Sequence, residues 1–360
     1  MNGSGQQKSR RDMNFEELTH KFAGRLIYVV GNARGGSTFA NTVFGTHPRL
    51  LEVRWNDKFF SDIWPKLSRL TDDELRHKLL RQPKYYSEER AIGQIGVENV
   101  RRLDAHVKNA CHKRDLRQLF CLQGILYWIM RGAKPCLEEI DGWCLKANTW
   151  KGVDLVKRAI PEARLIFVER DPRSTALSHA KVEARRRRKQ FTDADLVKGA
   201  LSWLRNAAEF AVRLQRYPES CVLLYEQLVN DPTSALNRAY RDLGLALIDK
   251  ATAESAMSDV QYKTTTAYGE ASSGISKPSG IQRAGLDRWR NELSVKQLHM
   301  VCALTFPGAR FFGYEMNARP GWWDVANALA QARGVALVRF SLVYFYCRGR
   351  LAIASRQVIA

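Results

Sequence analysis

The sequence lacks a long uncharged apolar run, which is what a membrane-spanning helix requires. Its longest stretch without Asp, Glu, Lys or Arg is Gly35–Pro48, 14 residues rich in Gly, Ser and Thr, whereas a span needs about 20 mostly apolar residues. Residues 1–23 are polar and have no apolar core of the kind that a secretory signal carries. We therefore expect a cytoplasmic protein without a membrane span.

Paired cysteine motifs are also lacking. The seven cysteines are an odd number, and no two of them have Cys-x-x-Cys spacing. This pattern is typical of buried reduced thiols and argues against a zinc site or a disulfide framework. We expect no bound metal.

Acidic residues are scarce relative to basic ones. The chain has 57 Lys and Arg against 37 Asp and Glu, a formal net charge of +20, which predicts a polyanionic partner, substrate or surface. The basic run Lys181–Lys189 (KVEARRRRK) is typical of a solvated helix face. No nucleic-acid-binding motif accompanies it, so we expect no nucleic-acid partner.

Short apolar runs alternate with amphipathic segments along the chain. The expected strands are Arg25–Val30, Arg164–Val168 and Cys221–Tyr225, and the expected helices are Ser37–Phe44, Val153–Ile160 and Asp193–Arg216. Such alternation predicts an α/β fold with a central parallel sheet flanked by helices.

The domain organisation follows from composition. We expect a flexible polar N-terminus at 1–23, one domain at 24–316 and a C-terminal amphipathic, basic segment at 317–360. Thr264–Gly285 has the composition of a mobile loop over a site. Val335–Ala354 interleaves aromatic and aliphatic residues with arginines, which predicts either an interfacial or partner-binding helix or a helix packed on the main domain.

A glycine-rich turn, Gly31–Thr38 (GNARGGST), follows the first expected strand and opens the first expected helix. Backbone amides at such a helix start can hold a phosphate or sulfate. The turn has the outline of a nucleotide P-loop, but Ser37 stands where that motif has lysine. An ATP-dependent kinase is therefore a disfavoured alternative.

A second candidate site lies after the Arg164–Val168 strand. Arg170 stands at the strand end, and Ser178 lies two turns into a helix that begins near Pro172. A guanidinium and a hydroxyl in this arrangement can hold one phosphate. The alternative is a surface pair of Arg170 and Asp171 beside a solvated serine.

The two segments together resemble the sulfotransferase family that uses 3′-phosphoadenosine-5′-phosphosulfate. Its first signature is a strand followed by a loop such as Arg/Lys-Ser-Gly-Ser/Thr-Ser/Thr, and its second is Arg-Asp-Pro-Arg with a serine eight residues past the first arginine. Matching segments here are Arg34–Thr38, Arg170–Arg173 with Ser178, Leu145–Asn148, Tyr225–Leu228, Leu243-Gly244 and Arg288–Arg290. The resemblance runs from about Arg25 to Tyr314 and implies a sulfotransferase with a P-loop nucleotide-kinase-like fold.

The resemblance also implies roles for individual residues. It assigns the 5′-phosphosulfate of the donor to Arg34, Gly35, Gly36, Ser37 and Thr38, the 3′-phosphate to Arg170 and Ser178, and a contact with the adenine to Tyr225. Lys146 would stabilise the bridging oxygen, or else neutralise a surface acid at a strand end. A late Arg-Lys-Gly motif of the family is matched only in part, by Arg283.

The expected catalytic base is a carboxylate. Cytosolic relatives carry a histidine base at the position of Asn148, and asparagine cannot take a proton. Glycan-modifying relatives place an acid shortly after the His-Pro that follows the loop. Here Glu52 and Asp57 follow His47-Pro48, and we favour Asp57 slightly because it precedes Phe59-Phe60.

A carboxylate base and a basic surface favour a carbohydrate or glycolipid acceptor. A small alcohol, phenol or amine stays open as acceptor. Peripheral contact with an anionic membrane is a further expectation, which depends on Val335–Ala354. The alternative to an enzyme is a non-catalytic binder of nucleic acid or acidic polysaccharide.

Overall fold

The computed structural model describes residues 13–56, 59, 63–81, 86–132, 137–259, 286–316, 320–331, 341 and 343–352. The chain divides into two compact units, which are described separately. Unit 1 comprises residues 1–28, 47–147 and 151–164, and unit 2 comprises residues 29–46, 148–150 and 165–360.

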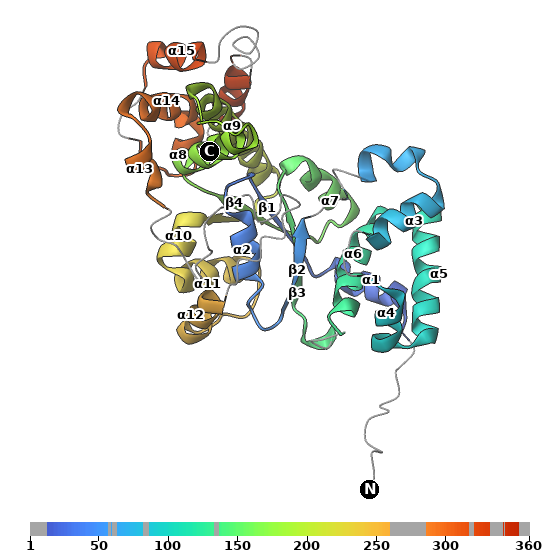
Figure 1. The fold of residues 1–360 in the computed structure, drawn as a ribbon. Coiled ribbons are helices and arrows are strands. Elements are labelled where there is room, and N and C mark those ends of the chain that lie inside the picture. Colours follow the sequence, from blue (N-terminus) through green and yellow to red (C-terminus); the bar gives the residue numbers. More distant parts are fainter. Residues whose placement is uncertain are drawn as a thin grey trace. The chain divides into compact units, whose positions relative to one another are not determined.

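Five strands form one parallel sheet in the order β2-β3-β1-β4-β5 (Figure 1). They are β1 (Leu26–Gly31), β2 (Leu50–Asn56), β3 (Gly142–Ala147), β4 (Arg164–Glu169) and β5 (Cys221–Leu224). Every residue of β1 and of β3 is buried, as expected for strands that are covered on both faces. The predicted α/β class with a parallel sheet is confirmed.

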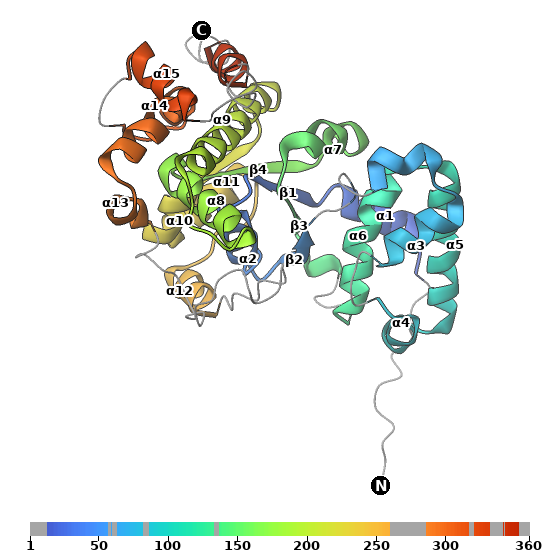
Figure 2. The same ribbon diagram turned by 45° about the horizontal axis from the view of Figure 1, so that its top comes forward.

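Unit 1 carries a cluster of helices that pack on one another (Figure 2). They are α1 (Phe15–Ala23), α3 (Asp72–Arg81), α4 (Glu88–Ile95), α5 (Val97–Lys113) and α6 (Leu116–Met130), and the unit also contains α7 (Val153–Ala159) and the 3₁₀ turns η2 (Trp64–Arg69) and η3 (Leu137–Glu139). Helix α6 is buried over nearly all its length, from Leu119 to Met130.

The start of the chain differs from the prediction. We expected a flexible polar segment over 1–23, but residues Phe15–Ala23 form α1. The cause is an apolar stripe at helical spacing, in which Phe15, Leu18 and Phe22 are buried. Asn14 caps this helix by accepting hydrogen bonds from two backbone amides of its first turn. Residues 1–12 lie outside the described residues.

Unit 2 contains a second set of helices. They are α2 (Ser37–Phe44), α8 (Pro172–Arg186), α9 (Asp193–Arg216), α10 (Tyr225–Asn230), α11 (Pro232–Asp242), α12 (Lys250–Asp259), α13 (Arg288–Glu292), α14 (Val295–Phe311) and α15 (Trp322–Ala330), and η4 (Trp150–Gly152) begins in this unit. Both α2 and α9 have the bounds that the sequence predicts.

Helices α8, α9 and α14 lie side by side (Figure 2). The contact between α8 and α9 is close because Gly199 faces Ala176. A β-carbon at position 199 would lie 2.8 Å from the carbonyl oxygen of Ala176. This close packing holds α8, which carries Ser178, against α9.

Within the predicted segment Val335–Ala354, residues 343–352 form a helix with one buried face. Tyr344, Cys347 and Leu351 are buried, and Arg350 forms an ion pair with Glu209 of α9 at 3.5 Å. These residues therefore form a helix that packs on its own unit, which is the second of the two predictions made for this segment. Residues 335–340, 342 and 353–354 of the predicted segment Val335–Ala354 lie outside the described residues. Within the described chain, no helix has the length and apolar character that crossing a membrane takes.

Candidate functional site

The turn between β1 and α2 leads from a buried strand into the N-terminus of a helix, the arrangement that the sequence predicts for an anion-binding turn. Gly36 is the N-cap of α2 and forms no side-chain hydrogen bond to the first helical turn, whose amides point out of the helix start. Gly36 has φ +86° and Arg34 has φ +69°. Glycine adopts this left-handed conformation without strain. For Arg34 it is uncommon and strained, and such strain is typical of ligand-binding turns.

Gly36 is also required by packing. A β-carbon at this position would overlap the ring of Tyr225, the first residue of α10. The Tyr225 ring in turn packs edge-on against Phe39, with ring centroids 5.5 Å apart. Tyr225 therefore lies against the turn that the sequence predicts as the phosphate-binding loop.

Two asparagines outside the turn, Asn206 and Asn148, form side-chain hydrogen bonds with residues of the turn. The Nδ2 of Asn206 on α9 donates to Oδ1 of buried Asn32 at 2.9 Å. The hydroxyl of Ser37 donates to Oδ1 of Asn148 at 3.3 Å. Asn148, which stands where some relatives have a catalytic histidine, thus lies beside the loop serine.

The structure brings the two sequence motifs together. The Nε of Arg34 donates to the hydroxyl of Ser178 at 3.1 Å, and the guanidinium of Arg170 lies 4.5 Å from the ring centroid of Tyr225. Four predicted donor-site residues from three separate segments therefore form one cluster in unit 2. Thr38 is exposed at the start of α2.

The predicted alternative of an Arg170–Asp171 surface pair is wrong. Asp171 is buried and forms its ion pair with Arg173, at 2.6 Å. Arg170 instead lies over the ring of Tyr225. The reason is that Asp171 caps α8, which turns its carboxylate toward Arg173.

Unit 1 holds two of the predicted catalytic residues. Lys146 on β3 is 6% exposed and Glu52 on β2 is 4% exposed. Burial lowers the pKa of the Lys146 ammonium to about 8, although the nearby Glu52 carboxylate opposes that shift. Lys146 is therefore a cation that loses its proton only slightly above neutral pH.

Two predicted residues, Asp57 and Arg283, lie outside the described residues, as does the predicted loop Thr264–Gly285. Among the residues that are described, no three His, Cys, Asp or Glu side chains gather in a way that could hold a metal ion. The roles assigned to Asp57 and Arg283 stay predictions.

Sequence reasoning missed several residues of this cluster. Asn206 and Trp203 lie on α9 and Tyr314 follows α14, and all three lie outside the sequence motifs. No local pattern marks these three residues. Asn32 lies within the turn itself, and its position next to the glycines is the only sequence signal for it.

One protein-family model matches the chain. A model described as the sulfotransferase family matches residues 27–249, more than half of the chain. A search of curated protein sequences gives no significant match.

Solved structures of similar fold are sulfotransferases. The sulfotransferase domain of the curacin biosynthetic pathway has a TM-score of 0.50 at 15% identity, and the match covers 81% of this chain and 98% of that domain. The sulfotransferase domain of a Synechococcus olefin synthase has a TM-score of 0.48 at 17% identity, covering 81% and 95%. A sulfotransferase from Mycobacterium avium has a TM-score of 0.42 at 15% identity, covering 84% and 81%.

Proposed function

The chain belongs to the sulfotransferase family, and we propose that the donor of the sulfuryl group it transfers is 3′-phosphoadenosine-5′-phosphosulfate. The observation that carries this proposal is the single cluster in which Arg34 meets Ser178 and Tyr225 contacts both Gly36 and Arg170. A donor with phosphate groups at two positions needs two anion-binding sites. The cluster contains two candidates, which we call grips: the start of α2 with Arg34, and the pair Arg170 and Ser178.

The residues of the cluster fit the donor chemically. The first-turn amides of α2, together with Arg34, suit the 5′-phosphosulfate, because backbone amides and a guanidinium both favour anions. Arg170 and Ser178 suit the 3′-phosphate. The half-buried ring of Tyr225 beside the loop suits a contact with an aromatic base, since aromatic side chains are common partners of nucleobases.

The donor grip is tested by binding of adenosine 3′,5′-bisphosphate. We expect binding without metal, and Arg170→Ala should weaken it by about ten- to a hundredfold, because a charge-assisted hydrogen bond contributes about 1.5–3 kcal/mol. The measurement is titration calorimetry in EDTA. Arg185→Ala, in the exposed basic run at the end of α8, is the matched control for nonspecific charge and should change affinity little.

Two results would contradict this assignment. One is no binding of the bisphosphate together with tight binding of ATP once magnesium is added, which would favour a kinase. The other is equal weakening by Arg170→Ala and Arg185→Ala, which would favour the alternative of a basic polyanion binder.

Sulfuryl transfer breaks the bond between sulfur and the bridging oxygen of the donor and forms a bond from sulfur to the acceptor oxygen or nitrogen. The acceptor proton must go to a base, and the leaving phosphate gains negative charge. We assign the base to a carboxylate, Asp57 or Glu52, and the stabilisation of the bridging oxygen to Lys146.

The base is tested by amide substitution. Asp57→Asn or Glu52→Gln, whichever replaces the base, should lower turnover by about 10²–10⁴-fold while donor affinity stays nearly unchanged, because the amide cannot accept a proton. The measurement is turnover with saturating donor, with calorimetry as the control for binding. Full turnover in both variants would place the base elsewhere.

The role of Lys146 is tested by the pH profile of turnover. Because its pKa is about 8, the ammonium is present below pH 8 and is lost above it. If that charge stabilises the bridging oxygen, turnover should fall by about tenfold per pH unit above pH 8. Lys146→Arg keeps a cation at alkaline pH and should remove this fall. The same alkaline fall in Lys146→Arg would show that another group causes it.

A carbohydrate or glycolipid remains our proposed acceptor. The support is the net charge of +20, which attracts acceptors that are already anionic. Asn148, described above beside Ser37, also favours a carboxylate base over the histidine base of other relatives. Screening sulfation of glycans, phenols and amines with one donor would overturn the proposal if only phenols or amines react.

We propose that the protein is cytoplasmic and attaches to anionic membranes through an aromatic face of α15 and residues 343–352. Trp322 is 60% exposed, Trp323 81% and Phe345 51%. Trp322 stacks on Phe345, and the guanidinium of Arg348 lies 4.5 Å over the Trp322 ring. Exposed tryptophans beside arginine suit the boundary between headgroups and acyl chains.

Membrane attachment is tested by flotation with vesicles of anionic lipid. We expect the protein to float with them, and Trp322→Ser with Trp323→Ser should abolish flotation. Val295→Ser on α14 is the control, since Val295 is 72% exposed but lies outside this face. A protein that ignores anionic vesicles, or one that floats equally well in all variants, would exclude this face as an anchor.

A further inference from the structure

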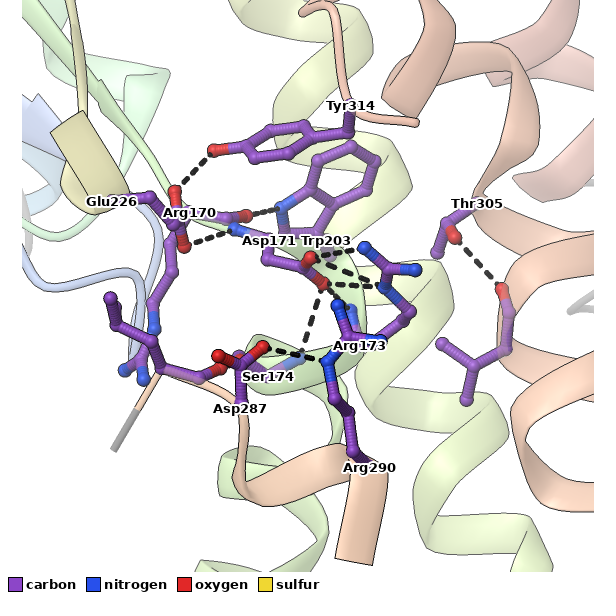
Figure 3. Close-up of polar contacts among 12 residues, drawn as sticks. Arg170, Asp171, Arg173, Ser174, Trp203, Glu226, Asp287, Arg290, Thr305 and Tyr314 are labelled. Atoms are coloured by element: carbon purple, nitrogen blue, oxygen red, sulfur yellow. Dashed lines mark hydrogen bonds and ion pairs between the residues drawn. The ribbon is translucent and has the colours of Figure 1, made fainter. Parts of the chain in front are cut away.

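The peptide group that joins Arg170 to Asp171 is held at both of its polar atoms (Figure 3). The indole Nε1 of Trp203 donates to the carbonyl oxygen of Arg170 at 2.9 Å. The amide of Asp171 donates to Oε1 of Glu226 at 3.0 Å. The carbonyl and the amide belong to one planar unit, so these two bonds fix the plane from which the Arg170 side chain departs.

Glu226 is itself held by a residue from another part of the chain. The hydroxyl of Tyr314, which follows α14, donates to Oε2 of Glu226 at 3.0 Å (Figure 3). Burial raises the pKa of the Tyr314 phenol well above its usual value, so this hydroxyl keeps its proton and stays a donor. Tyr314 lies beyond residues 27–249, which the family model matches.

The chain after this peptide group is fixed as well. Asp171 caps α8 by accepting from the amide of Arg173 at 2.7 Å, and the Arg173 guanidinium lies 4.0 Å over the Trp289 ring. The hydroxyl of Ser174 donates to the carbonyl of Leu286 at 2.8 Å. The start of α8 is therefore anchored, and with it the direction in which Ser178 is carried.

The partner of the Asp171 amide is a carboxyl that the fold largely removes from water. Burial raises the pKa of the Glu226 carboxyl, although the hydrogen bond from the Asp171 amide opposes that shift. A backbone amide at a strand end is usually satisfied by water or by another backbone group. Here a half-buried carboxyl does this at the peptide group that carries the proposed phosphate-binding arginine.

We propose that Glu226 and Tyr314 are positioning residues for the 3′-phosphate of the donor, an inference that rests on the proposed function. They hold the Arg170–Asp171 peptide group so that Arg170 and Ser178 face the same phosphate. Neither residue touches the donor. They act on the 3′-phosphate grip alone and leave the grip at the start of α2 unaffected.

The test compares two ligands that differ only in this phosphate. Adenosine 3′,5′-bisphosphate and adenosine 5′-phosphate are titrated into the full chain, and the ratio of their affinities measures the contribution of the 3′-phosphate. Tyr314→Phe should lower this ratio by about three- to tenfold, the effect of one lost hydrogen bond, while affinity for adenosine 5′-phosphate stays unchanged.

Tyr346→Phe is the matched control. The hydroxyl of Tyr346 also bonds to a buried glutamate of unit 2, Glu209, at 3.4 Å, but outside the cluster. This variant should leave the ratio unchanged. A Tyr314→Phe variant whose affinities for both ligands fall together, or do not change, would overturn the proposal.

Substitutions of Glu226 separate positioning from charge. Glu226→Gln keeps an oxygen for the Asp171 amide and an NH₂ group for the Tyr314 hydroxyl, so it should keep the wild-type ratio or raise it. Glu226→Leu removes both bonds and should lower the ratio by about tenfold or more. Equal ratios in the two variants would overturn the proposal.

The two affinities of the wild-type protein separate a failure of the proposed donor site from a failure of the proposed role of Tyr314. If it binds both nucleotides with equal affinity, the proposed donor site is wrong. If it prefers the bisphosphate and Tyr314→Phe keeps that preference in full, the donor site stands and the positioning role of Tyr314 is wrong.

Discussion

The contact between Gly36 and the ring of Tyr225 is the constraint on which the site in unit 2 depends. Gly36 has a left-handed φ and no β-carbon, so the ring of Tyr225 can lie directly against the backbone at the start of α2. The same ring then receives the guanidinium of Arg170 on its face. A glycine in the loop, a tyrosine after β5 and an arginine after β4 are thereby fixed relative to one another, and a residue with a side chain at position 36 would separate them.

Much of the fold could be predicted because its signals are local. The strand, loop and helix around the glycine turn, and the long helix α9, follow from apolar periodicity within short windows, and both α2 and α9 begin and end where expected. Helix α6 escaped prediction for a physical reason: it is buried on nearly all sides, so it shows no polar face and no stripe. Helix α1 is short and lies in a polar stretch, where three buried side chains give a weak signal.

The residues proposed for the donor site were singled out by short sequence motifs, whereas the groups that contact them from other parts of the chain could not be predicted. Trp203, Asn206 and Tyr314 reach the motifs from α9 and from the end of α14, over 33, 174 and 88 residues of sequence to their respective partners. Hydrogen bonds of that range leave no periodic trace in a single sequence. The partner of Asp171 was mistaken for a different, local reason: its carboxylate direction depends on its role as the cap of α8, which turns it toward Arg173 and not toward the residue before it.

The beginning of α10 contacts both proposed anion-binding sites, through two different residues. Tyr225 and Glu226 are adjacent, yet the first contacts the loop before α2 through its ring while the second holds the backbone after β4 through its carboxyl. Both residues follow directly on β5, so the end of one strand places a contact at each of the two proposed sites. The hydrogen bond from Arg34 to Ser178 joins the loop to α8. The ring of Tyr225 and the carboxyl of Glu226 act on different segments, which is why loss of the Glu226 contacts is expected to leave the loop before α2 in place.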